Sequence, residues 1–444
     1  MWGQSGDERV TDELFPVGPA KPKTEPPAKE SECRLALPVR NQVEAVFSDL
    51  NGLIPLDHQV RVVWGYVERA DLTELYVKIK AVEGRPGRAA IDPRILLALW
   101  LYATLDGVGS ARALAKLCED SHPYRWICGG VSVNYHTLAD FRVESGEVLQ
   151  ELLIDGVTSL RVAGAVTLNR VAHDGKRVRA NAGSDSFRSK RTLERFQREA
   201  QEQVETLRRE LDENPAASDE RIKSARERAA RERQERVDAA LRQYDEVQKK
   251  KKHDKEKARV SITDPDARRM RMADGGSRPA YNVQFSTDTG SQVIVAVEVI
   301  NGGSDSDQLE PAVQRIEQLY GVIPPKLLAD GGYVNRQMIE NVSAQNCSVY
   351  MPVPAPNKKG YPRDRPFKTE TPRVTEWRER MATAEAQEIY KERAATAECV
   401  NALAHNRGLQ QFPVRGLKKV RAVALLFALA HNIMRAESLK KRAA

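Results

Sequence analysis

The first third of the chain carries its hydrophobic residues at helical spacing. The segment 91–104, IDPRILLALWLYAT, is almost wholly apolar, and the Asp-Pro pair near its start is typical of a helix N-terminus. Two shorter helices are predicted at 110–119 and 135–144. Short helices joined by turns that contain glycine, with Arg and His on exposed faces, suit a DNA-binding unit of the helix-turn-helix kind. A plain helical bundle fits the same spacing equally well.

Later segments alternate apolar and polar residues as strands do. The alternation predicts strands at 166–172, 280–286, 292–300, 326–329 and 348–353. The first is expected to deliver Asp174 at its end, and the fourth ends at Asp330. Three consecutive strands followed by alternating helices and strands predict a mixed sheet flanked by helices. Acidic groups at strand ends are natural site candidates, because loops at one edge of such a sheet form its cleft.

A highly charged region with two helical seams separates the first strand from the others. Apolar residues recur there at steps of three and four, from 193 to 211 and again from 222 to 244. An Asn-Pro pair between the seams breaks the helix, so an antiparallel helical hairpin is predicted at 187–259. Its lysine-rich end, 249–257, either contacts phosphates or is a solvated charge run, which is the more frequent case.

Composition narrows the class of partner. Lys and Arg number 70 against 62 Asp and Glu, which gives a net charge of +8 and a pI near 9.1. This balance favours a polyanionic partner without identifying one. The five cysteines are scattered without a Cys-x-x-Cys pair, so neither a disulfide framework nor a zinc site is indicated. With no signal pattern and no run near about 18 uninterrupted apolar residues, we expect a soluble, intracellular protein with no membrane partner.

Three carboxylates carry the candidate chemistry. Asp174 and Asp330 each follow a short apolar run, and Glu398 comes far downstream on a predicted helix. Brought together at one end of a sheet, such a trio can hold two hard divalent cations that activate an oxygen nucleophile and stabilise the leaving oxygen in phosphoryl transfer. Oxygen ligands fit Mg²⁺ or Mn²⁺, whereas zinc would normally require His or Cys. DNA strand chemistry is therefore the leading hypothesis.

Several neighbours of these carboxylates have plainer explanations. His173 would point away from Asp174 on a strand, which favours a structural role. Asp264 and Asp266 are explained better as turn formers than as contacts behind the site, and both interpretations stay open. Tyr333 is expected to pack beside the site, because no cluster of Arg, His and Lys accompanies it as a tyrosine recombinase would require.

Ordered blocks of sequence resemble the bacterial DDE-type insertion-sequence transposases. The blocks include RPGRAAIDPRILLALWL, HDGKRVRANA, RPAYNVQFSTD, LLADGGYVNRQM and NRGLQQFPVRGLKKVRAVALLFALAHN, and the resemblance covers nearly all of 52–435. It implies an α/β fold, in which an RNase H-like mixed-sheet catalytic core carries an N-terminal all-helical domain and an inserted helical hairpin. The expected divisions are a mostly disordered tail at 1–45, a helical DNA-binding domain at 46–160, a catalytic domain at 161–186 and 260–444, and the hairpin at 187–259.

The resemblance also implies roles for single residues. Asp174, Asp330 and Glu398 match the residues that bind the catalytic metals in this family, which here would be two Mg²⁺ or Mn²⁺ ions. Tyr390 and Arg393 match its Tyr-x-x-Arg signature, which engages the transposon end near the cut.

One position departs from the family pattern. Members commonly carry a basic residue seven positions after the glutamate, where this chain has His405. Histidine is largely neutral at pH 7 unless a phosphate raises its pKa. Either end binding is weakened in this copy, or Arg407, two residues further on, compensates.

The implied activity is that of a DNA transposase. Such a protein binds the terminal inverted repeats of its element, cleaves DNA with divalent metal, and joins the freed 3′-hydroxyl to target DNA. Its partner is double-stranded DNA, and synapsis of two ends implies a homodimer on DNA in the bacterial cytoplasm, associated with the nucleoid. Two alternatives stay open: a metal-dependent nuclease that does not join strands, and an inactive DNA-binding relative that represses the element.

Overall fold

The structure is a computed structural model of the whole chain, and it describes residues 49–81, 89–213, 220–250, 255–355, 367 and 369–443. The chain divides into two units, 1–48 and 49–444, and only the second contains described residues. The tail predicted at 1–45 and the Asn-Pro break between the helical seams lie outside the described residues.

The N-terminal part of the second unit is helical. Its helices are α1 (Gln59–Val67), α2 (Thr73–Val77), α3 (Pro93–Leu105), α4 (Ala111–Asp120), α5 (His122–Cys128), α6 (Tyr135–Glu144) and α7 (Gly146–Val162). The three helices predicted from the apolar spacing are confirmed as α3, α4 and α6. Asp92 caps α3 by accepting the Arg94 N–H, with proline in the first turn. The Trp100 indole on α3 donates to the Leu138 carbonyl at 2.9 Å, which ties α3 to α6.

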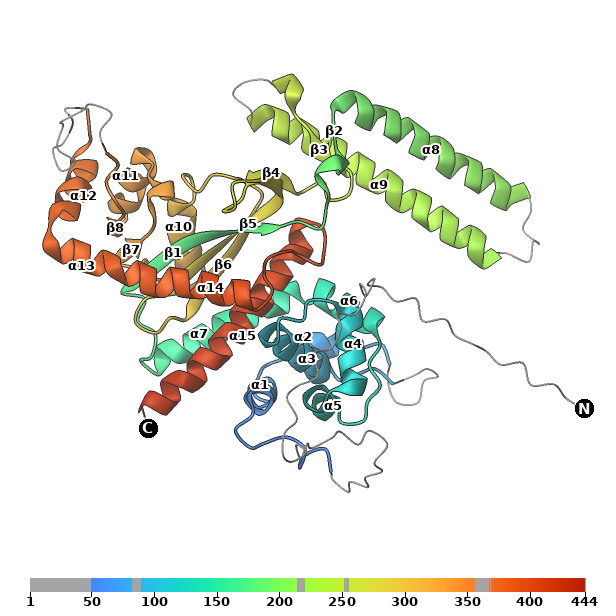
Figure 1. Cartoon of the computed structure of the whole chain (residues 1–444), viewed down its shortest axis with the longest axis horizontal. Helices are drawn as coiled ribbons and strands as arrows, with labels where there is room; N and C mark the ends of the chain where they lie inside the picture. The colour runs from blue at the N-terminus through green and yellow to red at the C-terminus, as the bar shows by residue number, and fades with distance from the viewer. Residues whose placement is uncertain are drawn as a thin grey trace, which may run out of the picture. The chain divides into compact units, whose positions relative to one another are not determined.

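A mixed sheet forms the centre of the second half (Figure 1). Its strands are β1 (Arg170–Arg179), β4 (Arg268–Arg271), β5 (Ser277–Asp288), β6 (Ile294–Ile300), β7 (Lys326–Leu328) and β8 (Ser348–Tyr350). The order is β4-β5-β1-β7-β8, and β6 also pairs with β5. β5 runs antiparallel to β1 and β6, whereas β7 and β8 run parallel to β1. Helices α10 (Leu309–Tyr320) and α11 (Arg336–Ala344) connect β6 to β7 and β7 to β8. The predicted mixed sheet and its order of strands and helices are confirmed.

The position of Asp174 within its strand differs from the prediction. The strand expected at 166–172 begins later and continues through Asp174, which pairs with Phe285 in the middle of the antiparallel β1–β5 ladder. An Asp-Gly pair usually signals a turn. Here Gly175 serves another purpose, since a Cβ at that position would lie 2.6 Å from the Gln284 amide nitrogen and 2.8 Å from Asp305. Close packing, not a turn, therefore accounts for the glycine.

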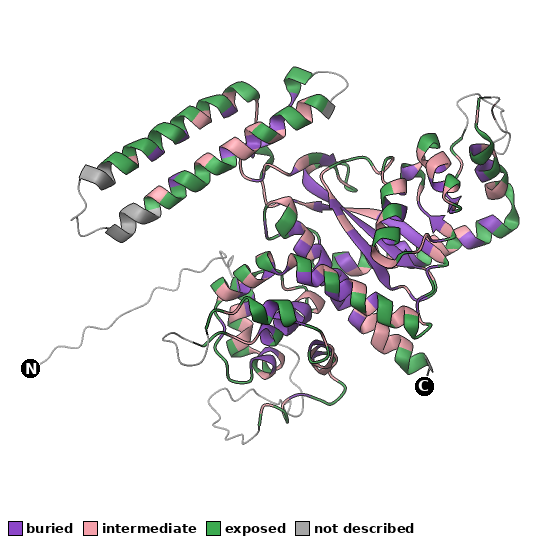
Figure 2. Cartoon of the chain, turned by 180° about the vertical axis from the view of Figure 1, so that it is seen from behind, coloured by how far each residue is buried: buried purple, intermediate pink, exposed green. Residues whose placement is uncertain are grey.

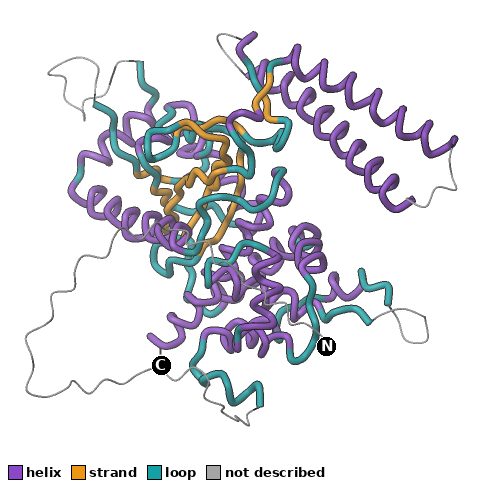
Figure 3. Tube along the Cα trace, turned by 45° about the vertical axis from the view of Figure 1, so that its right-hand side comes forward, coloured by secondary structure: helices purple, strands orange, loops and turns teal. Residues whose placement is uncertain are grey.

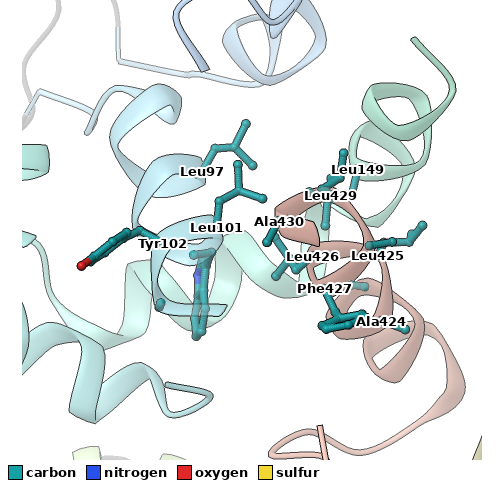
Figure 4. Packing of buried hydrophobic residues seen from close by; sticks show 14 of the residues in the cluster. Leu97, Leu101, Tyr102, Leu149, Ala424, Leu425, Leu426, Phe427, Leu429 and Ala430 are labelled. Atoms are coloured by element: carbon teal, nitrogen blue, oxygen red, sulfur yellow. The ribbon is translucent and has the colours of Figure 1, made fainter. Parts of the chain in front are cut away.

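The C-terminal helix α15 (Leu417–Ala443) joins the N-terminal helices to the sheet in one core. It packs against α3, α7 and β6, and in Figure 4 its apolar side chains face Leu97 and Leu101 of α3 and Leu149 of α7. Phe427 of α15 lies with its ring 5.6 Å from that of Phe285 on β5. The burial pattern in Figure 2 follows this arrangement, with buried residues along the sheet and the helices that cover it.

Length and apolar composition alone would allow α15 to cross a membrane. It is the one such helix among the described residues, and 56% of its apolar window is buried inside the protein. That burial is the property of a core helix.

The charged region between β1 and β4 folds as the predicted helical hairpin (Figure 3). Helices α8 (Lys190–Glu213) and α9 (Glu220–Lys250) follow a short strand β2 (Phe187–Arg188) and precede β3 (Val260–Ser261), which pairs with β2. The helices are antiparallel, because contacts that advance along α8 retreat along α9: Lys190 pairs with Asp245, Gln197 with Asp238 and Gln203 with Arg233. Leu193, Ala240, Tyr244, Ala258 and Val260 form a small buried cluster at the base.

Candidate functional site

Asp174 within β1 and Asp330, two residues after the end of the parallel strand β7, lie at the same level of the sheet. The register of β1 and β7 pairs Ala172 with Leu328. Each aspartate follows two residues later, so both side chains start from the same level of the sheet. Asp330 also caps a short 3-10 turn, Gly331–Tyr333, by accepting the Gly332 N–H at 2.8 Å. Its predicted place just after a strand is confirmed.

Helix α13 (Ala384–Arg393) covers the sheet face that carries Asp174. Side chains two residues apart on a strand share a face. Ala172, on the same face as Asp174, packs in one buried cluster with Leu328 of β7, Ile389 of α13 and Ala397 in the turn that follows. This packing holds the end of α13 above the two aspartates.

A π-helical turn sets the spacing between Arg393 and Glu398. After α13 the chain forms a π turn at Ala394–Glu398 and continues as α14 (Cys399–Asn406). Neighbours on an α-helix surface are three or four residues apart, whereas a π turn closes on the fifth residue. Arg393 and Glu398 therefore lie on one face, with Nη1 and Oε1 3.4 Å apart. Such π turns occur frequently at functional sites.

The guanidinium of Arg393 lies among all three carboxylates. Its Nη2 is 3.0 Å from Oδ2 of Asp174 and 3.9 Å from Oδ2 of Asp330, in addition to the contact with Glu398. The side chains of Arg393 and Asp174 are each only 12% exposed, whereas those of Asp330 and Glu398 are 43% and 65% exposed. The site is thus closed on the Asp174 side and open to solvent on the Glu398 side.

Asn401 contributes to the site, and the sequence analysis did not single it out. Its Nδ2 donates to Oδ2 of Asp174 at 3.0 Å, while its own Oδ1 is buried without a hydrogen-bond partner among the described residues. The Lys176 ammonium donates to the Asn401 carbonyl at 3.2 Å. The available signal was its position three residues after Glu398, which places it on the same side of the helix.

Burial raises the pKa of Asp174 to about 6 in the metal-free protein. The Arg393 guanidinium opposes this shift, and the Asp330 carboxylate adds to it.

Burial likewise raises the pKa of the half-buried Tyr390 phenol, against the effect of Arg393. Tyr390 lines a cavity of about 320 Å³ together with Pro352, Met381 and Gln387. Among the predicted residues, Tyr390 and Arg393 thus lie on α13 beside the aspartates.

His405, which stands where the family has a basic residue, and Arg407, which could compensate for it, lie in different environments. The His405 side chain is exposed on α14, about 10 Å along the helix axis from Glu398 by helical rise. Arg407 is half-buried, and its Nη1 is buried with no hydrogen-bond partner among the described residues. Burial lowers the pKa of its guanidinium. Compensation for His405 by Arg407 would therefore require Arg407 to turn outward.

Of the neighbours with plainer explanations, His173, Tyr333 and Asp264 are buried and Asp266 is half-buried. His173 hydrogen-bonds the Ser286 hydroxyl at 2.9 Å and lies edge-on to Tyr333, with ring centres 5.3 Å apart. Asp264 accepts the Tyr281 hydroxyl at 2.7 Å and the Gly416 N–H at 3.1 Å. Asp266 accepts the N–H of Leu417, the first residue of α15, at 2.9 Å. The two aspartates therefore anchor the start of α15, where acidic groups complement the helix dipole.

The donor set suits a hard divalent cation, although the carboxylates surround Arg393 in this structure. No group of three or more His, Cys, Asp and Glu side chains within the described ranges is arranged to hold a metal ion. Three carboxylates nevertheless converge on one guanidinium, and carboxylate oxygens are the ligands that Mg²⁺ and Mn²⁺ prefer. The chemistry of the donor set thus fits such an ion, although the guanidinium lies between the carboxylates.

Two family models match the chain. Residues 48–144 match a transposase domain (DUF772), and residues 334–436 match a transposase DDE domain. No curated protein and no solved structure matches the chain. The second match includes Tyr390, Arg393 and Glu398, while Asp174 and Asp330 precede it. Together the two matches support an insertion-sequence DDE transposase.

Proposed function

We propose that this transposase binds the ends of its insertion sequence, cleaves DNA there with divalent metal, and transfers the freed 3′-hydroxyl to target DNA. The observation that carries the proposal is the convergence of Asp174, Asp330 and Glu398 on one guanidinium from three distant segments. Three carboxylates that share one partner form a strongly anionic site. Such a site suits a cation-assisted reaction on a phosphodiester.

Asp174, Asp330 and Glu398 are the proposed ligands of two Mg²⁺ or Mn²⁺ ions. When bound, these ions activate the attacking oxygen and stabilise the leaving oxygen. The same carboxylates serve cleavage and joining, because only the nucleophile changes, from water to a 3′-hydroxyl. Asn401 orients Asp174 through its amide hydrogen bond.

The fold supports an RNase H-like catalytic core as part of this proposal. The antiparallel β1, β5 and β6, followed by the parallel β7 and β8, form the mixed sheet that this core requires. We propose the division already expected from the sequence, with the DNA-binding helices at 46–160, the catalytic domain at 161–186 and 260–444, and the hairpin at 187–259. Packing of α15 against both α3 and β6 would couple the first two of these parts mechanically.

The proposed DNA contacts extend outward from the carboxylates. Tyr390 and Arg393 lie beside Asp174, and the exposed His405 lies further along α14. Arg407 is the weaker candidate because of its burial. The proposed substrate is the pair of terminal inverted repeats with target DNA, and holding two ends together calls for a homodimer on DNA.

The test is a cleavage and joining assay on the DNA that flanks the gene. We expect Asp174→Asn, Asp330→Asn and Glu398→Gln each to abolish cleavage in Mg²⁺ or Mn²⁺ while DNA binding stays nearly intact, because an amide keeps the shape of a carboxylate but loses its charge. Glu388→Gln is the matched control, since Glu388 is exposed on α13 and paired with Lys391. Near wild-type cleavage in any of the three variants would remove that residue from the metal site.

The same assay separates the alternatives. Cleavage products without strand-transfer products would indicate a nuclease. DNA binding without any cleavage in Mg²⁺ or Mn²⁺ would indicate a repressor derived from a transposase.

A further inference from the structure

A cation, the Arg393 guanidinium, lies among the three carboxylates in this structure. Three carboxylates close together repel one another, and the Arg393 guanidinium lowers that repulsion by contacting each of them. Its shortest contact, 3.0 Å to Oδ2 of Asp174, is also its most buried one. Arg393 therefore does in the metal-free protein what a divalent ion would do in the loaded site.

This arrangement leaves buried polar atoms unsatisfied. Nε of Arg393 and Oδ1 of Asn401 are both buried with no hydrogen-bond partner among the described residues. A buried polar atom without a partner is unfavourable, because it has lost its hydrogen bonds to water. Both orphaned atoms belong to side chains that bind Oδ2 of Asp174. Arg393 and Asn401 thus bind Asp174 while another of their own polar atoms stays without a hydrogen bond. This cost favours replacement of the Arg393 contact when a divalent ion binds Asp174.

An ion shared by Asp174 and Asp330 would compete with the Arg393 guanidinium for the same space. A Mg²⁺ ion requires its oxygen ligands at about 2.0–2.1 Å with near-octahedral geometry. The guanidinium occupies the space between Asp174 and Asp330, where an ion shared by these carboxylates would lie. Two cations at that distance also repel each other. Metal binding must therefore move Arg393 away from Asp174.

We propose that Arg393 is a built-in counter-cation, which closes the metal-free site and is displaced by the divalent ion toward the phosphodiester of the DNA. The inference rests on the proposed metal site at Asp174, Asp330 and Glu398. A displaced guanidinium leaves its carboxylate partners but stays beside the reacting phosphate, because it is anchored on α13. Its planar fork of donors matches phosphate geometry. Metal and DNA then strengthen each other's binding, since such coupling is reciprocal.

Calorimetric titration with Mn²⁺, without DNA, tests the displacement. We expect Arg393→Gln to bind Mn²⁺ about tenfold more tightly than the wild type, within the range typical of coupling between two sites. Lys391→Gln removes one positive charge from the same helix, at a side chain that is 70% exposed, and should leave Mn²⁺ affinity unchanged. If Lys391→Gln raised the Mn²⁺ affinity as much as Arg393→Gln, the proposal would be overturned. The increase would then come from the lower net positive charge and not from the position of Arg393.

Asp174→Asn separates the inference from the function on which it rests. Equal Mn²⁺ affinity in the wild type and Arg393→Gln, together with lost binding in Asp174→Asn, would overturn the counter-cation and leave the metal site standing. Unchanged Mn²⁺ binding by Asp174→Asn would instead contradict the proposed metal site itself. Should Arg393→Gln not fold, the Arg393 Nε–H signal of ¹⁵N-arginine-labelled wild type decides the matter: it should shift on addition of Mg²⁺, and an unchanged signal would overturn the proposal.

The second half of the proposal is tested by DNA binding in Ca²⁺, measured by fluorescence anisotropy on a duplex taken from the element end. Ca²⁺ should strengthen binding by the wild type and by Lys391→Gln, and much less by Arg393→Gln. An equal Ca²⁺ effect in all three proteins would show that the displaced guanidinium does not reach the phosphate.

Discussion

The helical hairpin and the carboxylate site are built on opposite principles. The hairpin holds itself together through contacts between α8 and α9, with exposed ion pairs such as Arg231–Glu227 and Arg195–Glu199 on its surface. Pairs of this kind contribute about 0–1 kcal/mol each. The site draws single side chains from β1, from the end of β7 and from a π turn, and surrounds them with buried polar atoms. A substitution in the hairpin should therefore disturb only the hairpin. A substitution beneath the carboxylate site should disturb several segments, because the site is built from all of them.

The largest effect is expected where the core joins the N-terminal helices to the sheet. Phe427→Ala removes a buried ring that contacts Phe285, and should lower the free energy of unfolding by about 3–5 kcal/mol. Urea unfolding followed by both far-UV and near-UV circular dichroism checks this. Coincident loss of both signals would show that helices and sheet unfold together, and separate transitions would contradict a shared core.

In EDTA, the titration of Asp174 is expected to change the free energy of unfolding by about 3 kcal/mol at most. Its pKa of about 6 in the folded protein exceeds its ordinary value of 3.8, so between pH 4 and 6 the folded state binds more protons than the unfolded state. The contribution of Asp174 to stability is therefore complete below about pH 4 and is lost as the pH rises through 6. Asp174→Asn should flatten this part of the stability curve. Parallel curves for wild type and variant would show that the carboxyl does not titrate in that window.

Gly175→Ala should cost about 1–3 kcal/mol, because the added methyl group would meet Gln284, Asp305 and Asn282 within 3 Å. The strain lies directly behind Asp174, so Mn²⁺ affinity should fall as well. Gly156→Ala is the matched control on α7, where an added Cβ meets nothing within 4 Å, and should stabilise the helix by about 0.5–1 kcal/mol. Equal stability changes in the two variants would contradict the packing argument.

The smallest effect on the core is expected from removing the hairpin. Replacing 190–257 by a short Gly/Ser linker keeps the β2–β3 pair, and should shift the melting temperature of the remainder by no more than about 2–4 °C. Loss of cooperative melting would show that the hairpin is integral to the fold. Lower activity in a folded deletion would point instead to contact with DNA or a partner.

The helices, including the apolar faces of the two hairpin helices, could be predicted because the sequence patterns that specify a helix are local. The apolar run of α3, its Asp-Pro cap and the steps of three and four in α8 and α9 each act within a few turns of one helix. The succession of five strands along the chain could be predicted for the same reason, whereas their order in the sheet was not predicted and β4 was missed. A further exception was β1, where an Asp-Gly pair lies inside a strand because β5 pairs along its whole length.

The candidate carboxylates could be named from the sequence, but their arrangement could not. Asn401 gave no chemical signal, although it binds Asp174. Asp264 and Asp266 looked like simple turn residues, and they anchor the start of a helix about 150 residues later. Each of these contacts joins segments whose proximity depends on packing.

By itself the sequence determined the type and order of most elements and the basic balance of charge, because these depend on residue chemistry and short-range periodicity. The three candidate carboxylates were singled out by the resemblance of ordered sequence blocks. Only the tertiary structure decided that Arg393 lies among those carboxylates. That position depends on the parallel register of β1 and β7, on the packing of α13 over the sheet and on one π turn. Register and packing are settled by contacts between distant segments, and no pattern within a single segment reports them.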